Sequence, residues 1–322
     1  MRSMLRSRIR FAADSVRMFA RNRLAMIGVS IIALFGLAAA AYPLLIGTVF
    51  ASGVYDPVTG YDPDLIHPSP PVAGHWLGTD SLGRDVLSQL LEGAGPTWVL
   101  AVVAALTTAL VAVLVGAVGA LFRGWIDSVL ARISDAFLLL PAPIFMLIIG
   151  TSELSQDFGP VAFGLVYGLI TGVGAGAIVI RAQALKTLAA PFVDAARVAG
   201  CGRWRILTRH LLPHLYPLGA LYMMLSVVGA IVADGFASFL GQTGTRVNWG
   251  TMVYYGIAFP NPATGAPVWN ALLPPSLALS LLAAAFYLVS MGLRSVADPR
   301  YQSTRSASVG TSADWQLSAR NG

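Results

Sequence analysis

The stretch TWVLAVVAALTTALVAVLVGAVGALF, residues 97–122, runs for 26 residues without a single charged side chain. An α-helix rises ~1.5 Å per residue, so about 20 such residues cross the ~30 Å hydrocarbon core of a lipid bilayer. This stretch therefore predicts a transmembrane helix. The whole chain agrees with that reading, because 56% of its 322 residues are hydrophobic and only 11% are charged, against about 25% charged residues in globular domains.

Five further apolar stretches contain no Asp, Glu, Lys or Arg, and they are residues 24–46, 136–152, 160–180, 215–233 and 271–293. The stretch 136–152 is short and carries Pro141 and Pro143, which transmembrane helices tolerate where neighbouring helices satisfy the freed backbone groups. The first stretch exceeds the roughly 7–15 residues of a signal-peptide core, so we expect an uncleaved helix. We predict an all-α integral membrane protein with six transmembrane helices.

The basic residues predict the topology, because Lys and Arg accumulate in cytoplasmic segments. Residues 1–23, 123–135, 181–214 and the tail from 294 hold 19 of the 21 Lys and Arg residues. Loop 47–96 instead holds five Asp and one Glu against Arg84 alone. We expect both termini in the cytoplasm and loop 47–96 outside. Topology also accounts for the basic isoelectric point better than nucleic-acid binding does, since no basic face is interleaved with aromatic residues.

The predicted organisation has three parts. Residues 1–23 form a cytoplasmic segment, 24–293 form the transmembrane domain with external loop 47–96 and cytoplasmic loop 181–214, and 294–322 form a cytoplasmic tail. The tail is polar and aperiodic after about residue 301, which predicts disorder.

Four glycines recur every fourth residue in the fourth span, at Gly164, Gly168, Gly172 and Gly176. Such spacing places them on one helix face, where small residues let another membrane helix approach closely. A chance occurrence among 33 glycines is the alternative. We expect a packing ridge against a helix of this chain or of another.

Candidates for catalysis are weak. His210 and His214 have helical spacing, but Leu211 stands where a zinc-protease motif needs Glu. The single lysine, Lys186, follows no glycine-rich phosphate cradle, and there is no Gly-x-Ser-x-Gly elbow. Apart from Asp234 at the edge of the fifth span, the six spans lack ionisable groups for a proton relay. We expect no metal, no cofactor and no ATPase site, so a transporter of this kind must take its energy from elsewhere.

An external cluster contains His75, Asp80, Arg84 and Asp85. We expect a short helix capped by Thr79 or Asp80, with Arg84 either paired to Asp80 or reaching another part of the outer face. No nucleophile, metal set or cofactor cradle accompanies these charges, which favours a scaffold over an active site.

Cytoplasmic loop 181–214 contains a second candidate. Pro191 suits the first turn of a helix, FVDAARVAGCG continues it, and Gly200 and Gly202 end it. Phe192, Ala195, Ala196 and Ala199 share one stripe, which could enter a cleft on a cytoplasmic partner. A basic loop resting on anionic lipid headgroups is the alternative.

The stretch DAARVAGCGRWRILTRHLLP, residues 194–213, resembles the EAA loop of ABC-transporter inner-membrane permeases. The residues that carry this resemblance are Asp194, Ala195, Ala196, Gly200, Leu212 and Pro213, and Arg203 belongs to the same loop. HWLGTDSLGRDVLSQLLEGA (75–94), ASFLG (237–241), NWG (248–250) and LRSVADPR (293–300) look like the dipeptide, oligopeptide and nickel permeases, in particular the second of their paired subunits.

The resemblance implies a permease subunit with the bundle of a type I ABC importer, in the inner membrane of a bacterium. Its implied partners are a second permease, two cytoplasmic ATPases, an external solute-binding protein and membrane lipid. Segment 192–205 would be the coupling helix, and the ATPases would hydrolyse ATP. Peptides are the implied solute, with nickel or another small solute as the alternative. A self-sufficient channel or carrier and an intramembrane hydrolase are the competing hypotheses.

Overall fold

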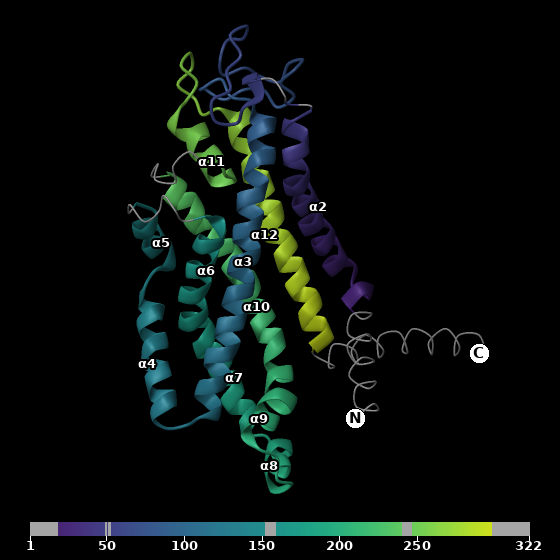
Figure 1. The fold of residues 1–322 in the computed structure, drawn as a ribbon, viewed down its shortest axis with the longest axis vertical. Helices are drawn as coiled ribbons and strands as arrows, with labels where there is room; N and C mark the ends of the chain where they lie inside the picture. The colour runs from purple at the N-terminus through teal and green to yellow at the C-terminus, as the bar shows by residue number, and fades with distance from the viewer. Residues whose placement is uncertain (1–18, 49, 51–52, 152–158, 240–246, 298–322) are drawn as a thin grey trace, which may run out of the picture.

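The computed structural model describes residues 19–48, 50, 53–151, 159–239 and 247–297. Within these residues the regular structure is helical, apart from two isolated β-bridges that pair Val72 with His75 and Thr79 with Asp85. The helices form an elongated bundle with irregular loops at one end and the short helix α8 at the other (Figure 1). The all-helical prediction is confirmed.

Helix bounds are as follows: α2 Arg23–Ile46, α3 Val86–Leu121, α4 Trp125–Leu139, α5 Ala142–Thr151, α6 Pro160–Thr171, α7 Ala177–Leu188, α8 Pro191–Val198, α9 Arg203–Ile206, α10 Leu212–Phe239, α11 Trp249–Ala258 and α12 Trp269–Ala297. Three short turns join this framework, namely the 3₁₀ turn η1 (Gly53–Tyr55) and the π-helical turns η3 (Gly172–Gly176) and η4 (Leu207–Leu211).

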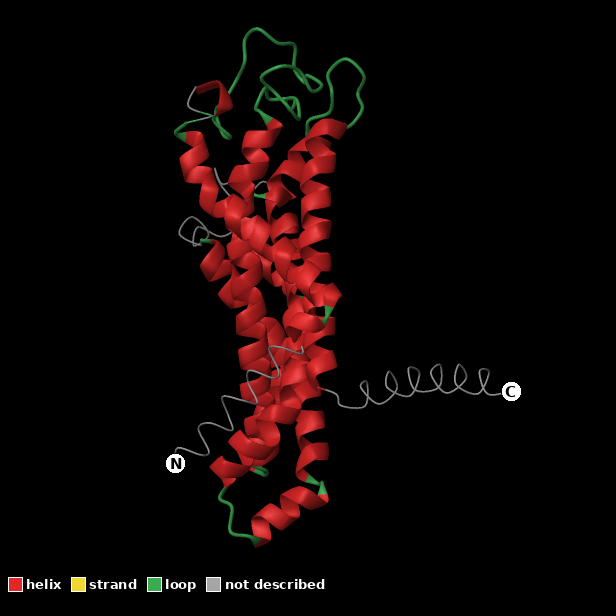
Figure 2. Cartoon of the chain, turned by 90° about the vertical axis from the view of Figure 1, so that its right-hand side faces the viewer, coloured by secondary structure: helices red, strands yellow, loops and turns green. Residues whose placement is uncertain are grey.

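Five continuous helical segments are long and apolar enough to cross a membrane: Arg23–Ile46, Val86–Leu121, Pro160–Leu188, Arg203–Ala237 and Trp269–Leu293. Helices α4 and α5, which meet at an angle of 76°, are together long and apolar enough to count as a sixth, broken span. Five or six spans by length and composition agree with the predicted six-helix protein. Figure 2 shows the long helices running side by side along the bundle.

The third span differs from the expectation of one helix over 136–152. Its helix α4 begins at Trp125, breaks at Leu140 and resumes as α5 at Ala142. The cause is Pro141, because a residue before proline is pushed out of the helical region, and Leu140 has the extended angles φ −80° and ψ 112°. The longer α4 also carries Asp127, Arg132 and Asp135, whereas the predicted span contained no charge.

The second span also begins earlier than expected. Helix α3 starts at Val86, so the last part of loop 47–96 is helical. The expected short helix capped by Thr79 or Asp80 is wrong, because residues 76–85 form turns. Gly78 and Gly83 have φ of +77° and +87°, a conformation that favours glycine and turns the chain away from helix. Asp85 is the N-cap of α3, and its carboxylate accepts a hydrogen bond from the Ser88 backbone N–H.

Helix α3 lies at the centre of the bundle and packs against α2, α6, α7 and α10. The glycine ridge of the fourth span faces it. An added Cβ at Gly164, Gly168 or Gly172 would lie within about 3 Å of α3 atoms, and one at Gly176 would lie 2.7 Å from Ala112. Glycine therefore lets α6 and η3 approach the α3 backbone closely.

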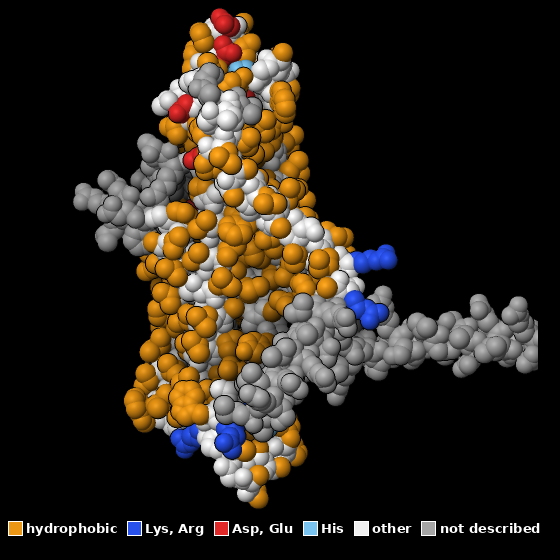
Figure 3. Space-filling model, turned by 45° about the vertical axis from the view of Figure 1, so that its right-hand side comes forward, with side chains coloured by type: hydrophobic (Ala, Val, Ile, Leu, Met, Phe, Trp, Pro, Cys, Tyr) orange, Lys and Arg blue, Asp and Glu red, His pale blue; other side chains and the backbone are white. Residues whose placement is uncertain are grey.

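Charged side chains separate towards opposite ends of the molecule. Figure 3 shows the red Asp and Glu side chains at the end with the long loops, and blue Lys and Arg side chains at the lower part of the molecule. The basic residues are concentrated in the segments predicted to be cytoplasmic, and loop 47–96 is strongly acidic, although Asp127, Asp135 and Asp194 lie at the basic end. The orientation in the membrane stays a prediction that this separation favours.

Candidate functional site

Helix α8 is a short element at the basic end of the bundle, placed by a proline and a glycine. Pro191 occupies its first position, after Ala190 in an extended conformation. The helix ends before Gly200, whose φ of +78° lies in the left-handed region. The N–H of Cys201 donates to the carbonyl of Ala196 at 3.0 Å and closes the last turn.

One side of α8 is fixed to the bundle. Val193 is fully buried in a cluster with Leu188 of α7, Ile206 of α9, Leu211 of η4 and Leu215 of α10. The Phe192 ring stacks on the His214 ring, with centroids 5.6 Å apart and planes inclined by 21°. Because these contacts reach both flanking helices, α8 is held as a rigid extension of α7 and α10.

The opposite side of α8 is open. Ala195 and Ala199 are exposed, and Val198 is 91% exposed although it is a large apolar residue. Asp194 is also exposed, and its carboxylate accepts a 2.8 Å hydrogen bond from Arg197 one turn later. We call Ala195, Val198 and Ala199 the α8 open face.

The expected stripe on α8 is thus split between two environments. Ala195 and Ala199 face outward, Ala196 is half-buried, and Phe192 turns back onto His210 and His214. The single coupling helix over 192–205 that the resemblance implied is wrong, because α8 ends at Val198 and α9 starts only at Arg203, and the predicted ending at Gly200 is confirmed. The glycine conformation at Gly200 causes this break.

The remaining residues of the loop resembling the EAA sequence lie close to α8. The Arg203 guanidinium lies 5.7 Å from the centre of the Phe122 ring at the end of α3. Leu212 packs against the cluster that buries Val193, whereas Pro213 is exposed in the first turn of α10. His214 hydrogen-bonds through Nδ1 to the His210 carbonyl at 2.8 Å. No group of three His, Cys, Asp or Glu residues suited to a metal ion occurs among the described residues.

At the opposite end, Asp80 and Arg84 form a buried ion pair. Arg84 Nε donates to Asp80 Oδ2 at 2.8 Å, and Gln89 of α3 donates to the same oxygen at 3.2 Å. The other Asp80 oxygen accepts the backbone N–H groups of Leu82 and Arg84, both at 2.9 Å. The Arg84 guanidinium lies 4.4 Å from the centre of the Tyr255 ring, which connects this turn to α11.

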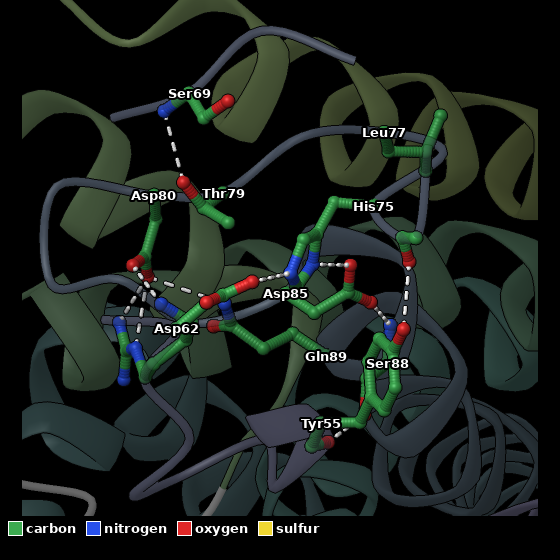
Figure 4. Close-up of polar contacts among 12 residues, drawn as sticks. Tyr55, Asp62, Ser69, His75, Leu77, Thr79, Asp80, Asp85, Ser88 and Gln89 are labelled. Carbon is green, nitrogen blue, oxygen red and sulfur yellow. Dashed lines mark hydrogen bonds and ion pairs between the residues drawn. The ribbon is translucent and has the colours of Figure 1, made fainter. Parts of the chain in front are cut away.

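His75 is buried between two carboxylates (Figure 4). Its Nδ1 lies 2.8 Å from Asp85 Oδ1, and its Nε2 lies 3.2 Å from Asp62 Oδ2. Each ring nitrogen of His75 therefore faces one carboxylate oxygen, which fixes the orientation of the ring. Two hydrogen bonds lower the pKa of Asp62 below its ordinary value. The larger effect comes from the backbone N–H of Asp64, and the smaller one comes from the His75 side chain.

The structure adds two anchors that no sequence pattern indicated. Asn270, at the start of α12, donates from its amide nitrogen to the carbonyls of Ser69, Leu77 and Thr79 at 3.0, 3.2 and 3.0 Å. His67 bridges the Thr79 hydroxyl and the Asp62 carbonyl. A single amide at a helix start or a single imidazole in a loop carries no spacing signal, so Asn270 and His67 could not be selected from the sequence.

These contacts describe a structural cap. His75, Asp80, Arg84 and Asp85 are all buried, and each is held by partners from the loop or from α3. None of the four is a nucleophile placed beside a free base, and the described residues offer no adjacent metal set. The cluster fixes loop 53–85 onto the ends of α3, α11 and α12.

An apolar groove lies between α10, α11 and α12. Its volume is about 360 Å³, and it is lined by residues that include Val228, Val232, Phe236, Tyr254 and Leu279. Ser280 supplies a polar side chain in this lining. The groove opens on the surface of the bundle and is suited to apolar side chains of a partner helix or of a passing solute.

Comparison with known proteins gives consistent matches. Residues 110–303 match the family described as binding-protein-dependent transport system inner membrane component. Residues 10–70 match the family described as the N-terminal TM domain of oligopeptide transport permease C.

Individual relatives cover most of the chain. A putative peptide transport system permease protein of Brucella suis is 35% identical over 72% of this chain and 75% of its own length. The dipeptide transport system permease protein DppC of Bacillus subtilis is 30% identical over 92% of this chain and 88% of its own. The oligopeptide transport system permease protein OppC of Mycobacterium bovis is 31% identical over 90% and 95%.

Proposed function

This chain belongs to the family of binding-protein-dependent transport system inner membrane components, and we propose that it is one of two paired permeases in an ATP-driven peptide importer. It is a multi-pass inner-membrane protein. The proposed orientation has both termini and α8 in the cytoplasm and the loop 53–85 outside. The charge separation between the two ends of the bundle supports this orientation.

The α8 open face is the observation that carries the coupling part of the proposal. A helix with Val198 91% exposed is incomplete by itself, because a large apolar side chain gains by burial in a partner. Val193 and Phe192 fix the other side of α8 to α7 and α10. A cytoplasmic ATPase that receives this face would therefore move two membrane-crossing helices when nucleotide closes it.

The proposed division of labour assigns ATP hydrolysis to partner subunits. Lys186, the single lysine, lies on α7 and outside any phosphate-binding loop. The chain supplies half of the pathway, and the groove between α10, α11 and α12 supports a role in contacting the second permease or the solute. The proposed partners are thus a second permease, two ATPases and an external solute-binding protein.

Peptides are the proposed solute class. The relatives of Brucella suis, Bacillus subtilis and Mycobacterium bovis are named as peptide, dipeptide and oligopeptide permeases respectively, and each match covers at least 72% of this chain. These names support a peptide over the nickel alternative that the sequence motifs left open.

The test is to purify the tagged chain from its native membrane in mild detergent and identify its stoichiometric partners by mass spectrometry. We expect a second multi-span permease and one or two P-loop ATPases. Recovery of the chain alone in several detergents would contradict the proposal and favour a self-sufficient carrier.

A further inference from the structure

The outer loop exposes large apolar side chains. Ile66 is 92% exposed, Trp76 is 77% exposed and Tyr61 is 55% exposed. All three belong to the loop between η1 and α3, which lies beyond the ends of the long helices in Figure 1. Burial in a partner would stabilise such side chains, since their apolar surface is in contact with water.

The same loop is anionic. Asp56, Asp62 and Asp64 lie in it, and Asp64 is exposed. The one cation of segment 47–96, Arg84, is buried against Asp80 and does not neutralise the surface. Figure 3 shows red and orange side chains together at this end of the molecule. A partner that fits the loop needs apolar side chains and Lys or Arg.

The exposed side chains stand on a fixed backbone. Trp76 follows His75, which is held by Asp85 and Asp62, and precedes Leu77, whose carbonyl accepts from Asn270. Ile66 precedes His67, which is held by Thr79. Binding to such a preorganised surface loses little conformational freedom, which favours recognition by a folded partner.

We propose that Tyr61, Asp64, Ile66 and Trp76, here called the outer docking surface, bind the external solute-binding protein of the same transport system. This inference rests on the proposed function. Trp76 and Ile66 are the apolar anchors of the contact, since large buried side chains dominate interface energies. Asp64 orients the partner through its basic residues and accelerates association.

The competing occupant is the membrane interface, where Trp and Tyr also gather. Three aspartates in the same loop weigh against it, because carboxylates are repelled by anionic headgroups and gain nothing from acyl chains. Leu44, which is 73% exposed near the outer end of α2, is a matched lipid-facing position. It serves as the control.

The experiment uses the assembled importer in lipid nanodiscs and the purified binding protein of the same system. We expect Trp76→Ala and Ile66→Ala each to raise the Kd about tenfold or more, and Trp76→Phe to have a smaller effect. Leu44→Ala leaves the Kd unchanged. Asp64→Lys slows association and flattens its dependence on salt, because screening weakens attraction between opposite charges.

An unchanged Kd in both Trp76→Ala and Ile66→Ala, with ATPase subunits bound at wild-type stoichiometry, overturns the docking surface and leaves the proposed function intact. Failure of the wild-type assembly to bind the protein at all counts against the proposed function itself. If Trp76→Ala does not assemble, Ile66→Lys and Asp64→Lys decide the question, since both positions are exposed in the loop. Wild-type affinity in both would then overturn the inference.

Discussion

The guanidinium group of Arg181 donates hydrogen bonds to both carboxylate oxygens of Asp127, with Nη2 and Oδ2 2.7 Å apart. This ion pair joins α7 to the first turn of α4. Since α7 leads directly into α8, and α4 continues into the bent span with α5, the pair links the α8 end of the bundle to its most irregular span.

Removing one partner of this pair should destabilise the bundle modestly. The side chains of Arg181 and Asp127 are 33% and 17% exposed, so solvent weakens the attraction. We expect a coupling energy of about 1 kcal/mol between Arg181→Gln and Asp127→Asn, measured by thermal unfolding of the two single variants and the double variant. Strictly additive losses would show that the pair contributes nothing.

The glycine ridge should not tolerate side chains. A Cβ at Gly168 would lie 2.6 Å from the Thr107 Cβ and 3.0 Å from the Ala104 carbonyl oxygen. We expect Gly168→Ala to lower stability by about 1–3 kcal/mol through overpacking. Gly235→Ala is the matched control, because nothing lies within 4 Å of the added atom there. Equal melting temperatures for the two variants would contradict the close approach of α6 to α3.

Asp85 has two structural roles, as the N-cap of α3 and as a partner of His75. We expect Asp85→Ala to cost about 2–4 kcal/mol, from the lost cap and from the lost hydrogen-bond partner of the buried His75 ring. Asp85→Asn keeps an oxygen for the cap and should cost less. Chemical denaturation of the purified chain measures the stability loss of each variant. An Asp85→Ala variant as stable as the wild type would exclude both roles.

The outer loop should lose stability in acid. Because the Asp64 backbone N–H and the His75 side chain lower the pKa of Asp62, the ionised carboxylate favours the folded loop above its unfolded pKa near 3.8. That contribution is present at pH 7, and it is lost as the pH falls below about 4 through the folded-state pKa. Asp62→Asn should flatten the dependence of the melting temperature on pH in this range. An unchanged acid profile would show that Asp62 does not stabilise the fold by this route.

A charge on the α8 open face should uncouple the ATPase. We expect Val198→Asp to reduce ATPase recovery about tenfold or more, because a buried unpaired carboxylate is costly in an apolar groove. Thr208→Asp introduces the same charge at another exposed position of this end and should leave recovery unchanged. If the Val198→Asp variant recovers as much ATPase as the wild type, the proposal that α8 docks the ATPase is contradicted.

Composition and spacing predicted the features that depend on local rules. Long uncharged runs identified five continuous spans, and the spacing of Gly164 to Gly176 indicated a close-packed face. Pro191 and Gly200 marked the beginning and end of α8. Each of these follows from helix periodicity or from the backbone preferences of a single residue type.

Features that depend on tertiary contacts were missed or misplaced. Residues 136–152 were expected to form one span that tolerates Pro141. Sequence alone does not show whether neighbouring helices satisfy the backbone groups that a proline frees. Val193 shares a helix with exposed alanines, and only packing against Leu211 shows that it is an anchor. The carbonyl partners of Asn270 lie 191 to 201 residues away, where no sequence spacing applies.

The most direct measurement is solute uptake into proteoliposomes that contain the purified permease pair, with and without the ATPases, ATP inside and the binding protein outside. We predict peptide uptake that requires all of these components and stops when Val198→Asp replaces the native residue. Uptake of the same solute by this chain alone, without ATP or partners, would contradict the account of an ATP-driven importer.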